Sequence, residues 1–346
     1  MRRKGIPSRV AFVRNGAVRT ALTLLRRIFR WVLLGFGALL VLLLASIAIA
    51  YVNYAMWRSD RLEALESGSE TVDTELGRIE YVLKGERGPI MLYSHTTPGG
   101  YDSAPPAGRN FRVLAPSRPG YLGTPIEIGR TPSEQARVYA ALLDALGVQE
   151  PVLVMAASGG GPSGIAFAKM YPERTAGLLA IEAVSQSMPA DAGLPAFMQS
   201  DFAIWAVFSA VQRLQGAAGL VSMVIPDPAN RQRVLDDPEK VALFVPLIWS
   251  LWPASQRKAG WENDIQQFEH LALPTDTIRV PTLVIHGTED VNVPIAHSED
   301  LVRQNANARL FVVEGADHMM PLTHREIIRR AIDEFLMDNR LVEFLE

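Results

Sequence analysis

The chain contains no cysteine among its 346 residues. This absence excludes disulfide bonds, a cysteine nucleophile and a metal site with thiolate ligands. It also means that an oxidising compartment would leave the chain chemically unchanged. A nucleophile must therefore come from another residue type.

Acidic residues are missing from the first 59 positions, and basic residues are concentrated in the first 30. The basic residues there are Arg2, Arg3, Lys4, Arg9, Arg14, Arg19, Arg26, Arg27 and Arg30. Without these nine, the chain keeps 25 basic and 37 acidic residues, so residues 31–346 carry a net charge of −12. A body with this charge would repel polyanions, which argues against a nucleic-acid partner.

Charge is also absent from residues 31–52, WVLLGFGALLVLLLASIAIAYV. As a helix, this run would be about 33 Å long, enough to cross a hydrocarbon core of about 30 Å. Trp31 and Tyr51 lie near its ends, where aromatic rings favour the membrane interface. Because the basic side chains precede the run, the positive-inside rule places residues 1–30 in the cytoplasm and the body on the outer, periplasmic or extracellular, side. We therefore expect a basic cytoplasmic arm, a single transmembrane helix and a linker over residues 53–69.

Three other interpretations of this segment stay open. Ala48-Ile49-Ala50 has the small-x-small form of a cleavage site, so a signal peptide removed before secretion is one of them. A buried core helix is the second, and an Arg-rich, acid-free mitochondrial presequence is the third. The long basic region and the full-length apolar run favour retention as an anchor.

From residue 70 onward, short apolar runs alternate with helical patterns. Residues 71–76 and 78–85 alternate in polarity around Gly77 and predict a hairpin. Nearly continuous apolar runs, typical of strands buried on both faces, occupy residues 89–94, 111–117, 151–157, 177–183, 281–286 and 309–315. Thr131 and Glu134 form a capping box at the start of a helical pattern that ends near residue 147. This alternation predicts an α/β fold with a doubly wound, mostly parallel sheet.

Residues 186–277 interrupt the alternation. They show no strand pattern but hold many large aromatic residues: Phe202, Trp205, Phe208, Phe244, Trp249, Trp252 and Trp261. We expect a helical cap inserted into a core formed by residues 70–185 and 278–346. Most of these aromatic residues would pack the cap onto the core, and some could line an apolar pocket.

Ser158 follows a predicted buried strand and precedes three consecutive glycines in the stretch VLVMAASGGGPSG. A sharp strand-to-helix turn that exposes a hydroxyl needs small residues on both sides of the serine, because larger side chains would collide. Gly160 and Gly161 would allow the following helix to pack closely, and its N-terminus would stabilise nearby negative charge. Ser163 falls inside that helix and is expected to be structural.

This stretch resembles the nucleophile elbow of the α/β-hydrolase family, and the resemblance extends over residues 70–340. The family's G-x-S-x-G motif appears here as Ala156-Ala157-Ser158-Gly159-Gly160, with alanine in the first position. The resemblance implies an α/β-hydrolase fold and a serine nucleophile at Ser158. It also implies that neither a metal nor an organic cofactor is needed.

A serine hydroxyl needs a base beside it, and the family keeps its catalytic histidine in the loop after the last strand. His318, in VVEGADHMMP, lies there. The other histidines fit different roles. His270 lies in the cap, His286 ends a strand where it would pack, and His95 begins the loop HTTPGG. His297 and His324 lie in or beside helical patterns and are expected to be solvated.

The resemblance also implies the acid that orients His318. HGTEDVNVP matches the family's H-G-x-x-D-x-x-x-P pattern and assigns this role to Asp290, with Glu289 as a close alternative. Asp317 is disfavoured because neighbouring side chains in an extended loop diverge. Ser158, Asp290 and His318 follow one another in the order that the family uses.

The family's oxyanion hole requires two backbone N–H donors. The resemblance assigns one to Gly159 and the other to Thr97, in the loop SHTTPGGYD. Thr96 stands where the family has glycine, which makes the second assignment depend on the loop geometry. SRPGYLG resembles another loop of the family, in which Arg118 and Tyr121 would fix the surroundings of the pocket.

Together these features predict a membrane-anchored hydrolase that cleaves an ester or related acyl bond through an acyl-enzyme. Its substrate would be a small, apolar acyl compound. Proline-type aminopeptidases and perhydrolases share the fold and the serine, so both activities stay open. A non-catalytic, membrane-tethered binding protein is the alternative from another class. The sequence predicts no oligomeric state.

Overall fold

The computed structural model describes residues 9–189 and 195–345, with side chains from residue 22 onward. The chain forms two compact units that divide between Arg61 and Leu62. The described part of the first unit is helical. The second unit contains the sheet and all the predicted site residues.

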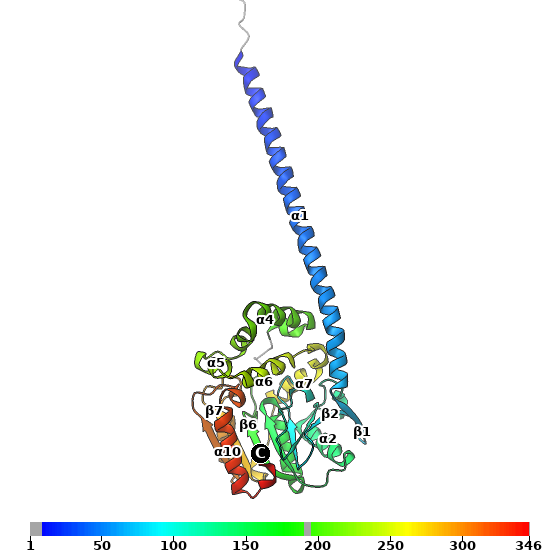
Figure 1. The fold of residues 1–346 in the computed structure, drawn as a ribbon, viewed down its shortest axis with the longest axis vertical. Helices are drawn as coiled ribbons and strands as arrows, with labels where there is room; N and C mark the ends of the chain where they lie inside the picture. The colour runs from blue at the N-terminus through cyan, green and yellow to red at the C-terminus, as the bar shows by residue number, and fades with distance from the viewer. Residues whose placement is uncertain (1–8, 190–194, 346) are drawn as a thin grey trace, which may run out of the picture. The chain divides into compact units, whose positions relative to one another are not determined.

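Helix α1 (Arg9–Ser67) is 59 residues long and includes the whole of the expected span (Figure 1). An 18-residue window within Leu22–Ser67 has a mean hydropathy of 2.8, and none of that window is buried. A helix of this length and composition could be a membrane anchor or a signal sequence. The expected linker at 53–69 is helical as far as Ser67, because no proline or glycine interrupts the chain before Gly68.

The body is built on an eight-stranded sheet with the order β1-β2-β4-β3-β5-β6-β7-β8. Its strands are β1 (Glu70–Thr74), β2 (Gly77–Lys84), β3 (Ile90–Ser94), β4 (Arg112–Pro116), β5 (Val152–Ala157), β6 (Thr175–Ile181), β7 (Thr282–Gly287) and β8 (Ala308–Val313). The first two form the predicted hairpin, and β2 runs antiparallel to β4. All the other neighbouring strands are parallel, so the prediction of a mostly parallel sheet is confirmed.

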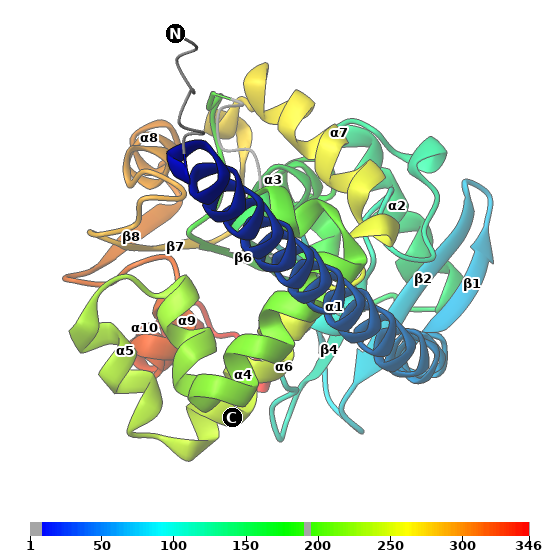
Figure 2. The same cartoon turned by 90° about the horizontal axis from the view of Figure 1, so that it is seen from above.

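Helices cover both faces of the sheet. They are α2 (Pro132–Ala145), α3 (Gly161–Met170), α8 (Ala296–Gln304), α9 (Met320–Thr323) and α10 (Arg325–Asp338). Alternate residues of the inner strands enter two separate cores: Val154 packs with α2 and α3, whereas Leu153 packs with α10. Figure 2 shows α2 and α10 on opposite sides of the sheet.

The predicted capping box at the start of α2 is present. The hydroxyl of Thr131 accepts a hydrogen bond from the backbone N–H of Glu134, and the Glu134 carboxylate accepts one from the backbone N–H of Thr131. Two backbone donors at the helix end are thereby satisfied.

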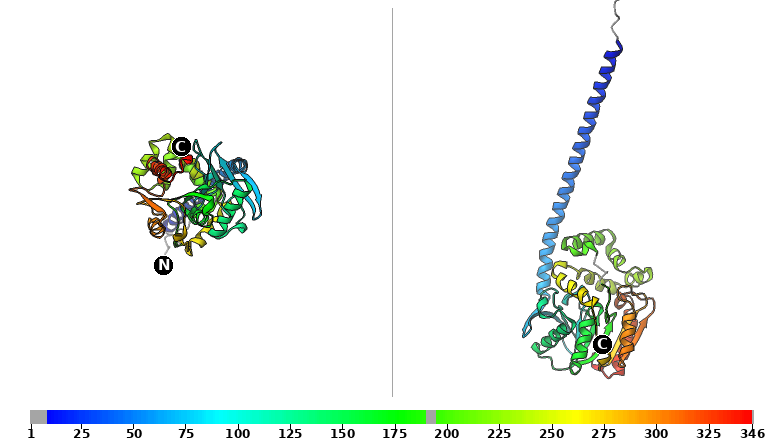
Figure 3. Two further views of the ribbon diagram at one scale, coloured as in Figure 1. Left: turned by 90° about the horizontal axis from the view of Figure 1, so that it is seen from below. Right: turned by 180° about the vertical axis from the view of Figure 1, so that it is seen from behind.

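Of the expected cap, between β6 and β7, the structure describes residues 186–189, which form neither helix nor strand, and residues 195–277, which are mostly helical. The latter contain α4 (Asp201–Val224), α5 (Pro228–Leu235), α6 (Pro238–Trp249) and α7 (Lys258–Glu269). These helices lie across one end of the sheet in the front and back views (Figures 1 and 3). Several of their aromatic residues pack on one another, as Phe208 does edge-to-face on Trp249 at a ring-centroid distance of 5.4 Å.

Candidate active site

Ser158 lies between the end of β5 and the start of α3. Its φ angle is +49°, a left-handed conformation that strains a non-glycine residue and persists only where the surroundings impose it. Its side chain reaches the carboxyl edge of the parallel strands, where ligands of open α/β sheets bind. The strained turn expected from the sequence is therefore present.

The glycines after the serine allow three backbone segments to approach one another. A Cβ atom at Gly160 would lie 2.2 Å from the carbonyl oxygen of Ser94, at the end of β3. A Cβ atom at Gly161 would lie 2.3 Å from the carbonyl oxygen of Val184, just beyond β6. Larger residues at either position would force α3 away from the sheet, so the predicted reason for these glycines is confirmed.

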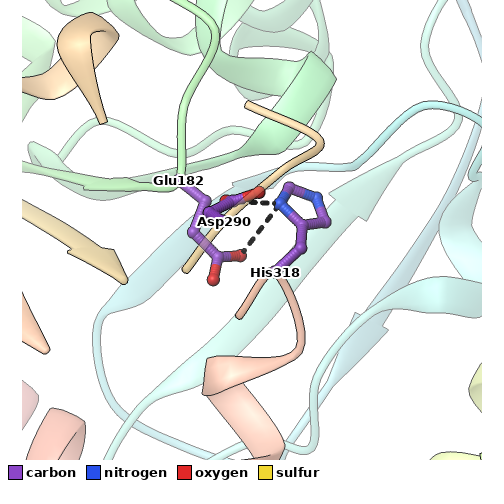
Figure 4. A group of neighbouring side chains, drawn as sticks. All are labelled: Glu182, Asp290 and His318. Atoms are coloured by element: carbon purple, nitrogen blue, oxygen red, sulfur yellow. Dashed lines mark hydrogen bonds and ion pairs between the residues drawn. The ribbon is translucent and has the colours of Figure 1, made fainter. Parts of the chain in front are cut away.

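The imidazole of His318 lies between Ser158 and Asp290. Its Nε2 atom is 3.0 Å from Oγ of Ser158. Its Nδ1 atom is 2.7 Å from Oδ2 of Asp290, and Figure 4 shows this second contact. The structure thus brings these three residues within hydrogen-bond distance. When Nδ1–H donates to the carboxylate, Nε2 is free to accept the proton of the serine hydroxyl.

The loop after β7 holds the carboxylate of Asp290. Its Oδ1 atom accepts hydrogen bonds from the backbone N–H groups of Asn292 and Val293, at 2.9 and 3.0 Å. His286 is buried beside it, with Nε2 3.4 Å from Oδ2. Burial alone would raise the pKa of Asp290, but hydrogen bonds from His286, His318 and Val293 hold that pKa well below its usual range. Asp290 is therefore an anion at neutral pH.

The two neighbouring acids have other positions. Glu289 has an exposed side chain. The Asp317 carboxylate accepts hydrogen bonds from the backbone N–H of Met319 at 2.9 Å and from the side-chain amide of Asn230 at 3.3 Å. Of these three acids, Asp290 is the one within hydrogen-bond distance of His318.

The expectation that His297 is solvated is wrong. Its side chain is buried, and Nδ1 accepts hydrogen bonds from the backbone N–H groups of Ser185 and Gln186. Burial, and secondarily nearby His286, lower the pKa of His297 to about 4, so it is neutral at pH 7. His324 is also half-buried rather than solvated, and burial lowers its pKa.

Glu182 was not predicted as a site residue. It follows β6 directly, is buried, and places Oε2 3.7 Å from Nδ1 of His318 (Figure 4). An acidic residue in the otherwise apolar run GLLAIEA is the signal that could have identified it. One donor atom from each of Glu182, Asp290 and His318 lies within 4.8 Å of the others, so the group could also hold a cation. A cation there would replace the hydrogen bond between Asp290 and Nδ1.

Thr97 lies against Gly159, on the other side of Ser158. A Cβ atom at Gly159 would be 2.1 Å from Oγ1 and 3.1 Å from the backbone nitrogen of Thr97. The two residues assigned to the oxyanion hole are therefore direct neighbours in space. Thr96 and Thr97 do not have positive φ angles, so the loop needs no glycine at either position.

The cap is joined to this loop by a buried ion pair. Arg118 and Asp264 of α7 are 2.6 Å apart, with side chains 1% and 4% exposed. The Thr97 hydroxyl donates to Oδ2 of Asp264 at 2.5 Å and accepts from Arg118 at 2.8 Å. Tyr121 also donates to Asp264, at 2.6 Å. The expected structural roles of Arg118 and Tyr121 thus include contacts with the cap.

A second buried pair links the cap to the same loop. Arg257 contacts Asp102 at 2.8 Å and donates to the carbonyl oxygen of Gly99 at 2.5 Å. Charged side chains buried this deeply are retained only when they are paired. The loop that carries Thr97 is therefore fixed to the cap at two points.

Comparisons with known proteins agree with this fold. A structure described as an alpha/beta hydrolase fold protein from Nakamurella multipartita superposes with a TM-score of 0.70 and 32% identity, over 78% of this chain and 98% of that one. A 2-hydroxymuconate semialdehyde hydrolase of Pseudomonas putida is 27% identical over 74% of this chain and 89% of that enzyme. The uncharacterized hydrolase YcgS of Bacillus subtilis (strain 168) is 39% identical over 122 residues, which span 34% of this chain and 42% of YcgS.

The family model covers most of the body. It begins at His95, in the loop that carries Thr97, and extends to Ala331 in α10, so it includes Thr97, Ser158, Glu182, Asp290 and His318. The match at residues 95–331 shows that this chain belongs to the α/β hydrolase family.

Proposed function

We propose that this protein is a membrane-anchored serine hydrolase that cleaves an ester or related acyl bond. The observation that carries the proposal is the line of contacts from Ser158 through His318 to Asp290, at 3.0 and 2.7 Å. A hydroxyl, an imidazole and an ionised carboxylate in this order can generate a nucleophile at neutral pH.

In the proposed reaction, Oγ of Ser158 attacks the acyl carbonyl carbon while Nε2 of His318 accepts the hydroxyl proton. Asp290 stabilises the resulting imidazolium through Nδ1–H. The N–H groups of Gly159 and Thr97 donate to the oxyanion of the tetrahedral intermediate. His318 then protonates the leaving group, which departs and leaves an acyl-enzyme. Water, deprotonated by the same imidazole, hydrolyses the acyl-enzyme and regenerates Ser158.

The substrate that we propose is a small acyl compound with an apolar portion. The aromatic content of the cap supports this, because the cap lies over the end of the sheet at which Ser158 is placed. One relative is named for 2-hydroxymuconate semialdehyde, so this compound belongs among those to be tested.

A substrate panel tests the chemistry. The values of kcat/KM should be compared for p-nitrophenyl esters of increasing acyl length, prolyl amides and 2-hydroxymuconate semialdehyde, and for peracid formation. Ester cleavage is expected to be the fastest. Ser158→Ala should lower kcat by at least about 10⁴-fold, whereas the exposed Ser133→Ala should leave it unchanged. Faster cleavage of prolyl amides, or faster peracid formation, would replace the esterase assignment with a peptidase or a perhydrolase, respectively. No turnover of any substrate would contradict hydrolysis.

We also propose that α1 anchors the protein, with the N-terminus in the cytoplasm and the body on the outer side. The nine basic residues before the apolar run support this orientation. In sealed spheroplasts, protease added from outside should digest the body, and the full-length chain should stay in the membrane after alkaline washing. A protected body would contradict the orientation, and a soluble body that lacks the first 50 residues would indicate signal cleavage.

A further inference from the structure

Glu182 has a buried carboxyl group that the proposed reaction does not use. Its side chain is 4% exposed, with Oε2 3.7 Å from Nδ1 of His318. Its Oε1 atom is buried and has no hydrogen-bond partner. A buried polar atom without a partner is costly, so its retention requires a physical reason.

The backbone at Glu182 is also strained. Its φ angle is +49°, as at Ser158, and the two residues directly follow the neighbouring strands β5 and β6. The N–H of Glu182 still donates to the carbonyl oxygen of Ile285 at 2.9 Å, so the chain keeps its pairing with β7 up to the strained residue. Strain of this kind persists where the surrounding structure imposes it, commonly at active sites.

Both Glu182 and Asp290 face the same nitrogen of His318 (Figure 4). Asp290 lies at 2.7 Å and Glu182 at 3.7 Å. Because each carboxyl faces Nδ1, either one would stabilise the tautomer that carries its proton on Nδ1. Nε2 would in both cases stay free to accept the proton of Ser158.

Burial, followed by the charges of Asp290 and Asp317, raises the pKa of Glu182 well above its usual range, although the backbone N–H of Met320 opposes this shift. His286 also faces the Asp290 carboxylate, with Nε2 3.4 Å from Oδ2. The opposite directions of the two pKa shifts favour a state in which the pair of carboxyls facing His318 holds a single negative charge, carried by Asp290.

We propose that Glu182 is a reserve acid for His318: a positioning residue on the neighbouring strand that pairs with the imidazole when Asp290 carries no charge. The inference rests on the proposed triad. Removing the Asp290 charge removes a repulsion that keeps Glu182 protonated. The imidazolium formed during proton transfer then attracts a carboxylate at the position that Glu182 already occupies.

The test compares Asp290→Asn, Glu182→Gln and the double variant of the full chain, with a p-nitrophenyl ester as substrate. Glu182→Gln alone should change kcat by less than about 3-fold, because glutamine keeps the neutral state and the shape. Asp290→Asn should lower kcat by about 10²-fold and the double variant by about 10⁴-fold, the loss typical when the acid of a triad is removed. KM should change little, because neither side chain binds substrate. Exposed Glu289→Gln, combined with Asp290→Asn, is the matched control and should add no loss.

Equal kcat values for Asp290→Asn and the double variant would overturn the inference while leaving the triad in place. No Ser158-dependent activity in the wild-type chain would overturn both. Thermal unfolding of each variant shows whether it is folded. If the double variant unfolds, Asp290→Asn combined with Glu182→Asp replaces it: the shorter acid cannot reach Nδ1 and should lose as much activity. Full activity in that variant would contradict a direct pairing.

Discussion

On one side of Ser158, the imidazole of His318 and the carboxyl groups of Asp290 and Glu182 all follow strands of the central sheet. On the other side, Thr97 would supply its backbone N–H. The hydroxyl of Thr97 donates to Asp264, which lies in the cap helix α7. We call these the proton-transfer side and the oxyanion side.

Both sides follow parallel strands that end at one edge, because the loop of Thr97 follows β3, but that loop is also held by buried charged side chains of the cap. Cap movement should therefore act directly on oxyanion stabilisation, whereas it reaches the loop of His318 through Asn230 of α5, which donates to Gly315 and Asp317.

The largest effect that separates the two sides is expected at the Thr97 hydroxyl. Thr97→Val keeps the backbone N–H but breaks the contacts with Asp264 and Arg118, so the donor should lose its position. We expect kcat to fall by up to about 10²-fold, near the loss of one oxyanion donor, with fluorophosphonate labelling of Ser158 slowed but still dependent on His318. Thr97→Ser keeps the hydroxyl and is the matched control.

Steady-state kinetics and thermal unfolding of both Thr97 variants provide the measurement. Equal kcat values for Val and Ser would show that the cap does not position the oxyanion side. The comparison between the two sides would then fail.

A smaller effect is expected in the pH dependence of stability. As the pH rises, ionisation of Glu182 should lower the free energy of unfolding, whereas ionisation of Asp290 should raise it. Because the folded state raises the pKa of Glu182, it keeps a proton that the unfolded chain releases. The wild type should therefore lose stability relative to Glu182→Gln as the pH rises above about 4.3, the ordinary value for Glu. Asp290 has a lowered pKa, so its contribution is present above about 3.9 and is lost as the pH falls through the folded value.

Urea unfolding should be measured for the wild type, Glu182→Gln and Asp290→Asn at several values across about pH 3–8. This range extends about one pH unit below the ordinary carboxyl pKa values and several units above them. The free energy of unfolding plotted against pH then gives the contribution of each carboxyl group. Parallel stability curves for the wild type and Glu182→Gln would show that Glu182 has no raised pKa. The single-charge description of the carboxyl pair would then be wrong.

Several features of the body could be predicted because they are recorded in local sequence. Apolar runs such as PVLVMAA predict strands that are buried on both faces, and Leu153 and Val154 indeed enter different cores. The glycines after Ser158 predict close backbone approaches, and the structure has them at Ser94 and Val184.

Other features depend on contacts between distant residues. Asp264 lies in the polar stretch WENDIQQ, a pattern typical of a solvated helix. In the structure it pairs with Arg118, 146 positions away in the sequence. Glu182 lies in a strand pattern, which gives no information on its φ angle or on the imidazole opposite. His297 lies on a helix with a strongly polar pattern, and its burial depends on amide groups of a segment 111 and 112 positions earlier.

Covalent labelling of Ser158 tests the central claim most directly. A fluorophosphonate probe reacts with a serine only when a base activates the hydroxyl and donors stabilise the negative charge that develops. After peptide mapping, we predict one modified residue, Ser158, in the wild-type chain, with labelling abolished in Ser158→Ala and slowed by about 10³-fold or more in His318→Gln. A folded wild-type chain that stays unlabelled at Ser158, or that is labelled equally fast without His318, would contradict a hydroxyl activated by that imidazole.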